Sequence, residues 1–226
     1  YVDQLLLGEG LALEGIQTVL DYFAQDVELG LGTQLWLIRG DTAQGAVRAG
    51  EENGVDSRLS TLQTDSEMGA AGITRTVGET SAALLEWGSA YLPALRAVEQ
   101  EREGETALLE AGYGVLRNGR LVGYLDGESA RGLELLTGRT TADILEVELP
   151  SGRTVARLAG AAVQWSPEFH GDELKKLRLT CRVNAALAEG RRQLEEREQE
   201  ELRRALEARE EERLRRVFPK TTRGGW

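Results

Sequence analysis

Few side chains in this sequence have the types and spacing that chemistry requires. His170 is the single histidine; it falls in a polar loop, and no Gly-x-Ser-x-Gly motif supplies a nucleophile to partner it. Glu146 and Glu148 alternate along a predicted strand, so their carboxylates share one face, as in a general acid–base pair. Because the chain has 38 acidic residues, chance explains this spacing better than catalysis does. A hydrolase that uses His170 or the two glutamates is the enzymatic alternative.

Cofactor and metal motifs are missing from the sequence as well. No His-Glu-x-x-His, Cys-x-x-Cys or Gly-Lys-Ser/Thr motif occurs. Gly8-Glu9-Gly10 begins like a dinucleotide fingerprint, but Leu13 stands where the third glycine belongs. Cys181 is the only cysteine, and it alternates with leucines, which predicts a small buried hydrophobic residue. We therefore expect no catalytic, cofactor-binding or metal-binding residue.

Composition narrows the class of protein further. The 226 residues, 41% hydrophobic and 29% charged, suffice for one large domain or two small ones. The net charge of −11 argues against nucleic acid as a partner and against docking on anionic lipid through a basic patch. No apolar run approaches the roughly 20 residues of a membrane-spanning helix. Because the sequence begins with Tyr1, we expect its natural start to lie upstream.

The first half of the chain predicts a mixture of helices and strands. Residues 2–7 and 34–38 read as parallel strands, joined by a helix whose apolar face repeats every three or four residues. A second helix is expected over residues 42–52. Residues 56–77 read mostly as loop, with a short helix around Leu59 and Leu62. A further helix, capped by Thr80, leads to an extended segment at residues 91–98, where Pro93 favours a sheet edge.

The middle of the chain carries the clearest local signals. Asn118-Gly119 lies between two apolar runs and suits a type I′ hairpin turn, since both central residues need a positive φ. Asp126 then caps a helix, with Glu128 in its first turn, where a negative charge is favourable. Gly138 ends that helix.

The last third predicts a sheet followed by one long helix. Residues 144–149, 154–165 and 174–183 read as strands, with a turn at residues 150–152. Residues 189–217 form a charged helix with Glu–Arg pairs four residues apart, for instance Glu200 and Arg204. Its apolar stripe is too sparse for a coiled coil, so the helix either lies on the sheet or docks a partner with its exposed end.

Together these elements define the expected fold class. It is α+β, with two mixed α/β domains; the C-terminal one is a mostly antiparallel sheet with the long charged helix packed on it. The charged run at residues 99–105 separates the domains, 1–105 and 106–226.

Two stretches resemble one known family. Residues 114–136 resemble the opening of the C-terminal domain of the Ger(x)C family, the C subunits of bacterial spore germinant receptors, through Asn118-Gly119, Leu121-Val122-Gly123-Tyr124-Leu125, Glu128 and Arg131-Gly132-Leu133. Residues 8–40 resemble that family's Gly-Glu-x-x-Ala-x-x-Gly helix and the apolar strand after it, through Gly8, Glu9, Ala12, Gly15 and Asp26. Family members continue beyond the long charged helix, so we expect the C-terminus here to be truncated.

The resemblance implies a function. Ger(x)C proteins are lipoproteins, held by an acylated N-terminal cysteine on the outer face of the spore inner membrane, where they act with membrane-embedded A and B subunits in sensing germinants. It therefore implies a non-enzymatic, lipid-anchored subunit without cofactors, whose anchor lies upstream of this sequence. The surfaces expected to contact partners are the region of Trp87 and Tyr91 and the long helix, through Arg203, Arg204 and Arg209. A lipoprotein that captures the germinant itself is the alternative.

Overall fold

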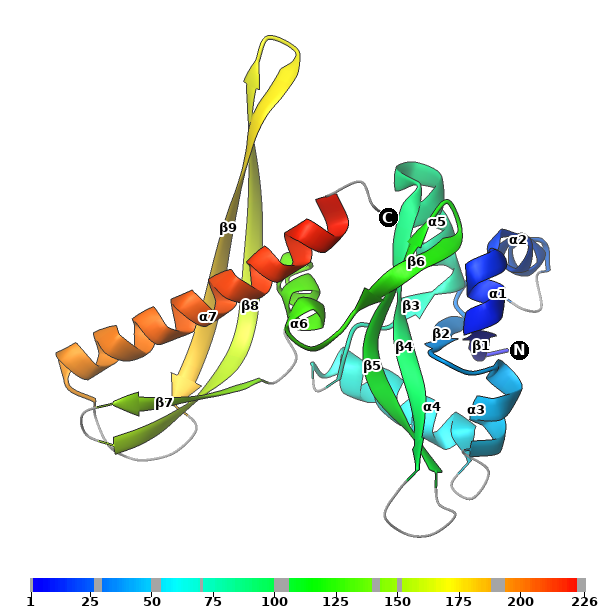
Figure 1. Ribbon diagram of the computed structural model, residues 1–226, viewed down its shortest axis with the longest axis horizontal. Helices are drawn as coiled ribbons and strands as arrows, with labels where there is room; N and C mark the ends of the chain where they lie inside the picture. The colour runs from blue at the N-terminus through cyan, green and yellow to red at the C-terminus, as the bar shows by residue number, and fades with distance from the viewer. Residues whose placement is uncertain are drawn as a thin grey trace. The chain divides into compact units, whose positions relative to one another are not determined.

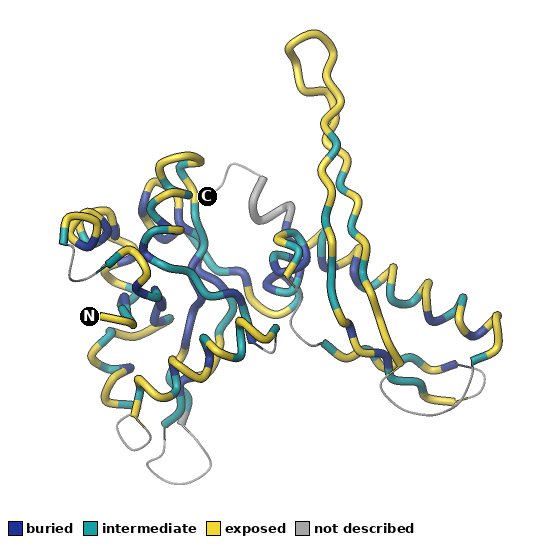
Figure 2. The backbone as a smooth tube through the Cα atoms, turned by 180° about the vertical axis from the view of Figure 1, so that it is seen from behind, coloured by how far each residue is buried: buried dark blue, intermediate teal, exposed yellow. Residues whose placement is uncertain are grey.

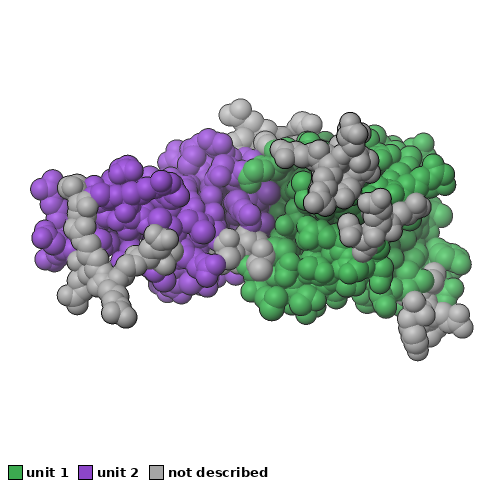
Figure 3. Space-filling model, turned by 90° about the horizontal axis from the view of Figure 1, so that it is seen from below, with its two compact units in different colours: residues 1–127, 223–226 green, residues 128–222 purple. Residues whose placement is uncertain are grey.

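The chain folds into two compact units. The computed structural model describes residues 2–26, 30–49, 54–69, 71–99, 106–139, 143–149, 152–187 and 194–222. The N-terminal unit extends to Gly127, and the C-terminal unit spans Glu128–Thr222 (Figure 3). The sequence predicted the division at residues 105 and 106; apart from Glu99, that expected linker lies outside the described residues. Residues 106–125 belong to the N-terminal sheet because they pair with the strand that precedes the linker.

The N-terminal unit is built on a mixed sheet whose strands stand in the order β1-β2-β4-β5-β6, with β3 paired to β2 (Figure 1). As predicted, β1 runs parallel to β2; β2 also runs parallel to β4, and the remaining pairs are antiparallel. The strand bounds are β1 Gln4–Gly8, β2 Gln34–Ile38, β3 Arg75–Thr76, β4 Ser89–Glu99, β5 Thr106–Arg117 and β6 Arg120–Leu125.

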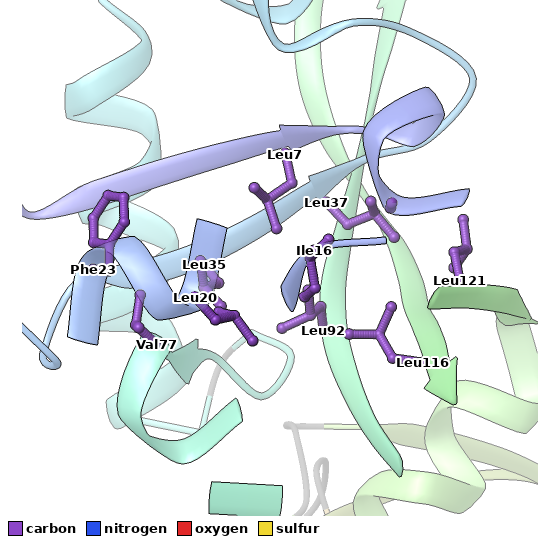
Figure 4. Packing of buried hydrophobic residues seen from close by; sticks show 11 residues of the cluster. Leu7, Ile16, Leu20, Phe23, Leu35, Leu37, Val77, Leu92, Leu116 and Leu121 are labelled. Carbon is purple, nitrogen blue, oxygen red and sulfur yellow. The ribbon is translucent and has the colours of Figure 1, made fainter. Parts of the chain in front are cut away.

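Helices cover both faces of this sheet and enclose its core. The helix predicted after β1 is two helices, because Gly15 adopts a φ of 133° between them. Leu35 and Leu37 of β2 pack in one apolar cluster with α1, α2 and α5 (Figure 4), whereas Trp36 and Ile38 pack in a second cluster on the other face, with α3 and α4. The helix bounds are α1 Glu9–Glu14, α2 Gln17–Gln25, α3 Ala43–Ala49, α4 Val55–Glu67 and α5 Val77–Trp87.

Three local predictions in this unit were wrong. Residues 55–67 are a full helix, α4, because Leu59 and Leu62 are buried against the sheet and hold it. The cap of α5 is Thr76, which forms a capping box with Glu79. Pro93 lies in β4, which has neighbours on both sides, and the strand tolerates it because the register with β5 shifts between Pro93 and Leu95.

The predicted hairpin is confirmed. Arg117 pairs with Arg120 across the turn, and Asn118 and Gly119 have φ values of 49° and 74°, the left-handed conformation that a type I′ turn requires. The backbone N–H of Ile16 donates to the carbonyl of Gly119 at 2.9 Å, so the turn also supports the start of α2.

The C-terminal unit is a three-stranded antiparallel sheet, β7-β8-β9, with two helices, as the fold class predicted. The first helix ends as expected at Gly138, whose φ is 71°; Gly138 and Arg139 donate back to Leu135 and Glu134 in a Schellman arrangement. A Cβ at Gly132 would lie 2.4 Å from the backbone oxygen of Arg213, so the two helices pack backbone to backbone there. The bounds are α6 Gly127–Leu136, β7 Ile144–Leu149, β8 Gly152–His170, β9 Glu173–Leu187 and α7 Glu196–Thr222.

Strands β8 and β9 form a long two-stranded ribbon that extends beyond β7, which pairs only with residues 152–157 of β8 (Figure 1). One face of the ribbon is apolar out to its tip. Its cross-strand pairs there are Val163–Cys181, Trp165–Leu179, Pro167–Leu177 and Phe169–Leu174. Ala156 and Leu158, at the base, are buried, whereas exposure increases toward the tip (Figure 2).

Some predictions fall outside the described residues, namely the turn at residues 150–151 and the start of the long helix at residues 189–193. None of the described helices is both long enough and apolar enough to cross a membrane.

Candidate functional site

The residues considered for catalysis do not come together. His170 ends β8 at the tip of the ribbon, whereas Glu146 and Glu148 lie on the exposed face of β7, which pairs with the opposite end of β8. Glu146 forms an ion pair with Arg153 of the neighbouring strand. In the part of the chain that the structure describes, no three histidine, cysteine or acidic side chains are grouped to hold a metal ion.

Cys181 lies on the apolar face of the ribbon, as its alternation with leucines predicted, but it is half-buried where the sequence predicted a buried residue. Burial raises the pKa of its thiol, and the negative charge of Glu210 raises it further. A thiol with a raised pKa is a poor nucleophile near neutral pH, so the environment of Cys181 matches a packing residue.

The first predicted contact surface separates into two different environments. Trp87, at the end of α5, is 72% exposed, and Leu85 beside it is 84% exposed. Tyr91 is instead packed in the N-terminal unit: its ring contacts that of Tyr113 edge to face, with centroids 5.7 Å apart, and the Arg75 guanidinium lies 4.2 Å from its centroid. Of these two predicted residues, Trp87 therefore offers an exposed surface and Tyr91 has a structural role.

In the second predicted surface, helix α7, two of the three predicted arginines are exposed and the third is packed. Arg203 and Arg204 are exposed and bind Glu200, which lowers the pKa of the Glu200 carboxyl to about 2. The predicted pairs four residues apart are present: Glu200–Arg204, Glu211–Arg215 and Glu212–Arg216. Arg209 was predicted on the exposed face, but its side chain is only 19% exposed. It binds Asp143 at 3.1 Å and the carbonyl of Ile144 at 3.2 Å, so it belongs to the packed face.

A buried ion network centres on Arg213, whose side chain is 6% exposed. Its guanidinium binds Glu128 of α6, Asp143 just before β7, and Glu210 one turn earlier in α7. Arg209 adds a second positive charge beside Asp143 and Glu210. The network thus joins three segments of the C-terminal unit, and its buried charges are compensated within it.

The network shifts the pKa values of its members. The hydrogen bond from Arg213 is the main reason that the pKa of the Glu128 carboxyl lies below its ordinary value. Burial alone would raise the pKa of Asp143, but hydrogen bonds and positive charge from Arg213 and Arg209 hold it below its ordinary value. Both carboxyls are therefore ionised at neutral pH, as ion pairing in a folded core requires.

The two stretches that resemble the same family meet in the N-terminal unit. The Tyr124 hydroxyl of β6 donates to Glu9 of α1 at 2.6 Å, and Arg39 stacks 4.3 Å over the Tyr124 ring while it binds Asp126 at 3.2 Å. Burial, then the hydrogen bond to Glu9, raises the pKa of Tyr124 above its ordinary value. This cluster fixes α1 against the sheet, which explains physically why both stretches carry those residue types.

Sequence reasoning missed the Arg213 network and the length of the uncovered ribbon. The network joins residues far apart in the chain, so no local pattern indicates it. A signal for the ribbon was present, because the apolar and polar residues of β8 and β9 alternate out to Phe169 and Leu174.

Taken together, the fold is that of a two-unit α+β protein whose described residues gather no catalytic set. Residues 111–224 match the family "Spore germination B3/GerAC like, C-terminal", and the chain belongs to that family, the Ger(x)C germinant receptor C subunits of spore germination. A crystal structure of the GerBC protein is similar to the chain, with a TM-score of 0.71 and 17% sequence identity.

That similarity covers 99% of this chain and 64% of the GerBC chain, so the chain spans less than two thirds of the length of that protein. At this identity the likeness concerns the fold. The sequence matches none of the curated proteins.

Proposed function

We propose that the chain is a non-enzymatic part of a spore nutrient germinant receptor that acts through protein contacts with the receptor's A and B membrane subunits. The observation that carries this proposal is the family match over residues 111–224. A lipid anchor upstream would hold the protein on the outer face of the spore inner membrane. Such a tether raises the local concentration of partners to about the millimolar range, so weak contacts suffice.

The distribution of the polar side chains supports a role in contact rather than catalysis. Glu128 and Asp143, whose pKa values are lowered, hold helices and strands of the C-terminal unit together through Arg213, and His170, Glu146 and Glu148 lie apart from them. A catalytic group must lie within hydrogen-bonding reach of the group it acts with. His170 is at the tip of the ribbon and Glu146 and Glu148 lie beside the other end of β8, so these three side chains cannot act as one set.

The partner contact is tested with the full-length protein and its A and B subunits. Co-purification from detergent-solubilised membranes is compared between the wild type and two variants, Trp87→Ala and the double variant Arg203→Glu with Arg204→Glu. Both change exposed side chains. Failure of the wild-type protein to co-purify with either subunit would overturn the proposal.

The absence of catalysis is tested in spores. The variant His170→Ala and the double variant Glu146→Gln with Glu148→Gln are expected to germinate at the wild-type rate. Loss of the germination response, in a variant shown by circular dichroism to be folded, would favour the hydrolase. Saturable binding of an amino acid or sugar germinant to the purified protein would favour direct capture of the nutrient.

A further inference from the structure

The outer half of the β8–β9 ribbon presents one continuous apolar face that the rest of the described C-terminal unit leaves uncovered. Phe169 is 62% exposed, Leu174 50% and Leu177 49%, in the outer part of the ribbon, which Figure 2 shows as mostly exposed. The strand register places all three on the same face. On β8 the same face is buried at the base, where Ala156 and Leu158 are 1% and 3% exposed, although Leu187, opposite Ala156 on β9, is 41% exposed. The ribbon therefore continues an interior surface out into solvent.

The opposite face of the same ribbon is polar. Glu168 pairs with Lys176 across the strands and forms an ion pair with Arg178 at 3.0 Å. A ribbon with no partner would gain nothing from sorting its side chains in this way, and a contiguous exposed apolar strip is a marker of an interaction surface. The sorting persists over the full outer length, which argues that something covers the apolar face.

A lipid bilayer fits this ribbon poorly. Beyond residue 157 of β8, both edges of the ribbon lack a neighbouring strand among the described residues, so their backbone N–H and C=O groups need polar partners that the hydrocarbon region cannot supply. The tip, with His170, Gly171, Asp172 and Glu173, is polar and carries two carboxylates. Insertion by the tip would have to bury those charges.

A second copy of the chain also fits poorly. The outer apolar strip is about 20 Å long and two strands wide, roughly 200 Å², against the ~800 Å² per partner of a stable complex. Strands β8 and β9 carry six basic side chains and two acidic ones, in a chain whose net charge is −11. Two ribbons packed face to face would bring like net charges together without enough area to offset the cost.

We propose that the outer apolar face of the ribbon docks onto a partner protein that presents a strip of aliphatic side chains bordered by acidic ones. Such a partner satisfies the open strand edges with its own polar groups and complements the basic ribbon. Because the strip is small, the partner must be concentrated beside it, which a shared membrane provides. This inference rests on the proposed function and adds to it the surface that makes the contact.

The experiment compares two triple variants of the full-length protein, each with three exposed side chains changed to serine on one face of the ribbon. The apolar-face variant is Phe169→Ser, Leu174→Ser and Leu177→Ser. The matched polar-face control is Gln164→Ser, Glu168→Ser and Thr180→Ser, which keeps every basic side chain of the ribbon. The apolar-face variant is expected to lose co-purification with a membrane subunit at least tenfold, while the control retains it and both keep the wild-type melting temperature.

The outcomes separate this inference from the proposed function. If the wild-type protein co-purifies and the apolar-face variant does so equally well, the ribbon is not the docking surface and the proposed function stands. If no form co-purifies, both fail. Binding of the wild type, but not the apolar-face variant, to protein-free anionic vesicles overturns the inference in favour of lipid. A wild-type dimer that becomes a monomer in that variant, measured by sedimentation equilibrium, overturns it in favour of a second copy.

Discussion

The N-terminal sheet and the C-terminal ribbon differ in how many of their faces are apolar and in what covers those faces. In β2, Leu35, Trp36, Leu37 and Ile38 are all at most 2% exposed, because helices lie on both faces of the sheet. In the outer ribbon, the apolar face is half exposed and the opposite face polar. A strand that is apolar on both faces therefore lies in a core here, and the one-sided ribbon without a cover is where we propose that a partner binds.

The largest loss of stability is expected from a change to the buried charged residue Arg213. Arg213→Met removes the positive centre of the ion network and leaves Glu128, Asp143 and Glu210 without it, which should destabilise the C-terminal unit by about 3–5 kcal/mol. The measurement is urea unfolding followed by hydrogen exchange of peptides from α6 and α7. Arg215→Met, which removes an exposed pair with Glu211, is the matched control and should change nothing measurable. Equal effects of the two variants would mean that the network is not a core element.

Two leucine variants, one in each unit, test the comparison between the covered sheet and the uncovered ribbon directly. Leu37→Ala removes a fully buried side chain from the N-terminal core and should cost about 2–5 kcal/mol of unfolding free energy. Leu177→Ala, on the ribbon, should cost less than about 0.5 kcal/mol because the side chain is already half exposed. Hydrogen exchange of β2 and β9 peptides in urea reports each unit separately. A large loss of stability with Leu177→Ala would show that the ribbon face is covered within the chain itself.

Acidification should weaken the C-terminal unit before the N-terminal one. The pKa values of Glu128 and Asp143 lie below their ordinary values of 4.5 and 3.8, so both groups bind protons more weakly in the folded state than in the unfolded state. Their contribution to stability is therefore fully present above about pH 4.5 and is lost as the pH falls through the lowered values. Thermal unfolding between pH 6 and pH 2.5 measures this loss. In Arg213→Met the pH dependence should largely disappear, and its persistence would assign the effect to other carboxyls.

The smallest effect concerns two glycines, one in the hairpin turn and one in strand β8. Gly119→Val should destabilise the N-terminal unit by about 1–3 kcal/mol, since Gly119 has a φ of 74° that a β-branched residue resists. Gly160→Val should be neutral, because a Cβ there meets no atom within 4 Å and valine suits a strand. Melting temperatures of the two variants give the comparison, and equal values would contradict the assigned turn.

The features that the sequence predicted are those with local causes. The hairpin at Asn118-Gly119 needs two adjacent residues with positive φ, and the β-α-β start follows from periodicity within 40 residues. The sequence did not predict the full length of helix α4. Leu59 and Leu62 are its only buried side chains among the described residues, so the helical repeat of apolar residues is weak. The burial of Arg209 was not predicted because its partner, Asp143, lies far away in the sequence and no local pattern connects the two residues.

In the candidate site, too, the features with local causes were predicted and those that depend on distant residues were not. Alternation placed Leu177, Leu179 and Cys181 on one face, as the structure has them. Sequence alone could not tell that this face is covered at Ala156 and uncovered at Phe169, because cover depends on how far α7 and β7 reach along the ribbon. The exposure of the apolar side chains, by which we identify the candidate docking surface, depends on the tertiary fold.

The central claim, that the apolar face of the ribbon contacts a membrane subunit, is tested most directly by site-specific photocrosslinking. A photoreactive amino acid is placed at Leu177 or at its neighbour Arg178 in the full-length protein, and membranes are irradiated before the products are identified by mass spectrometry. Leu177 and Arg178 are both exposed but point to opposite faces. We expect crosslinks to the A or B subunit from position 177 at least five times more abundant than from position 178. Equal crosslinking from both positions, or products at 177 that contain only lipid or a second copy of the chain, would contradict the claim.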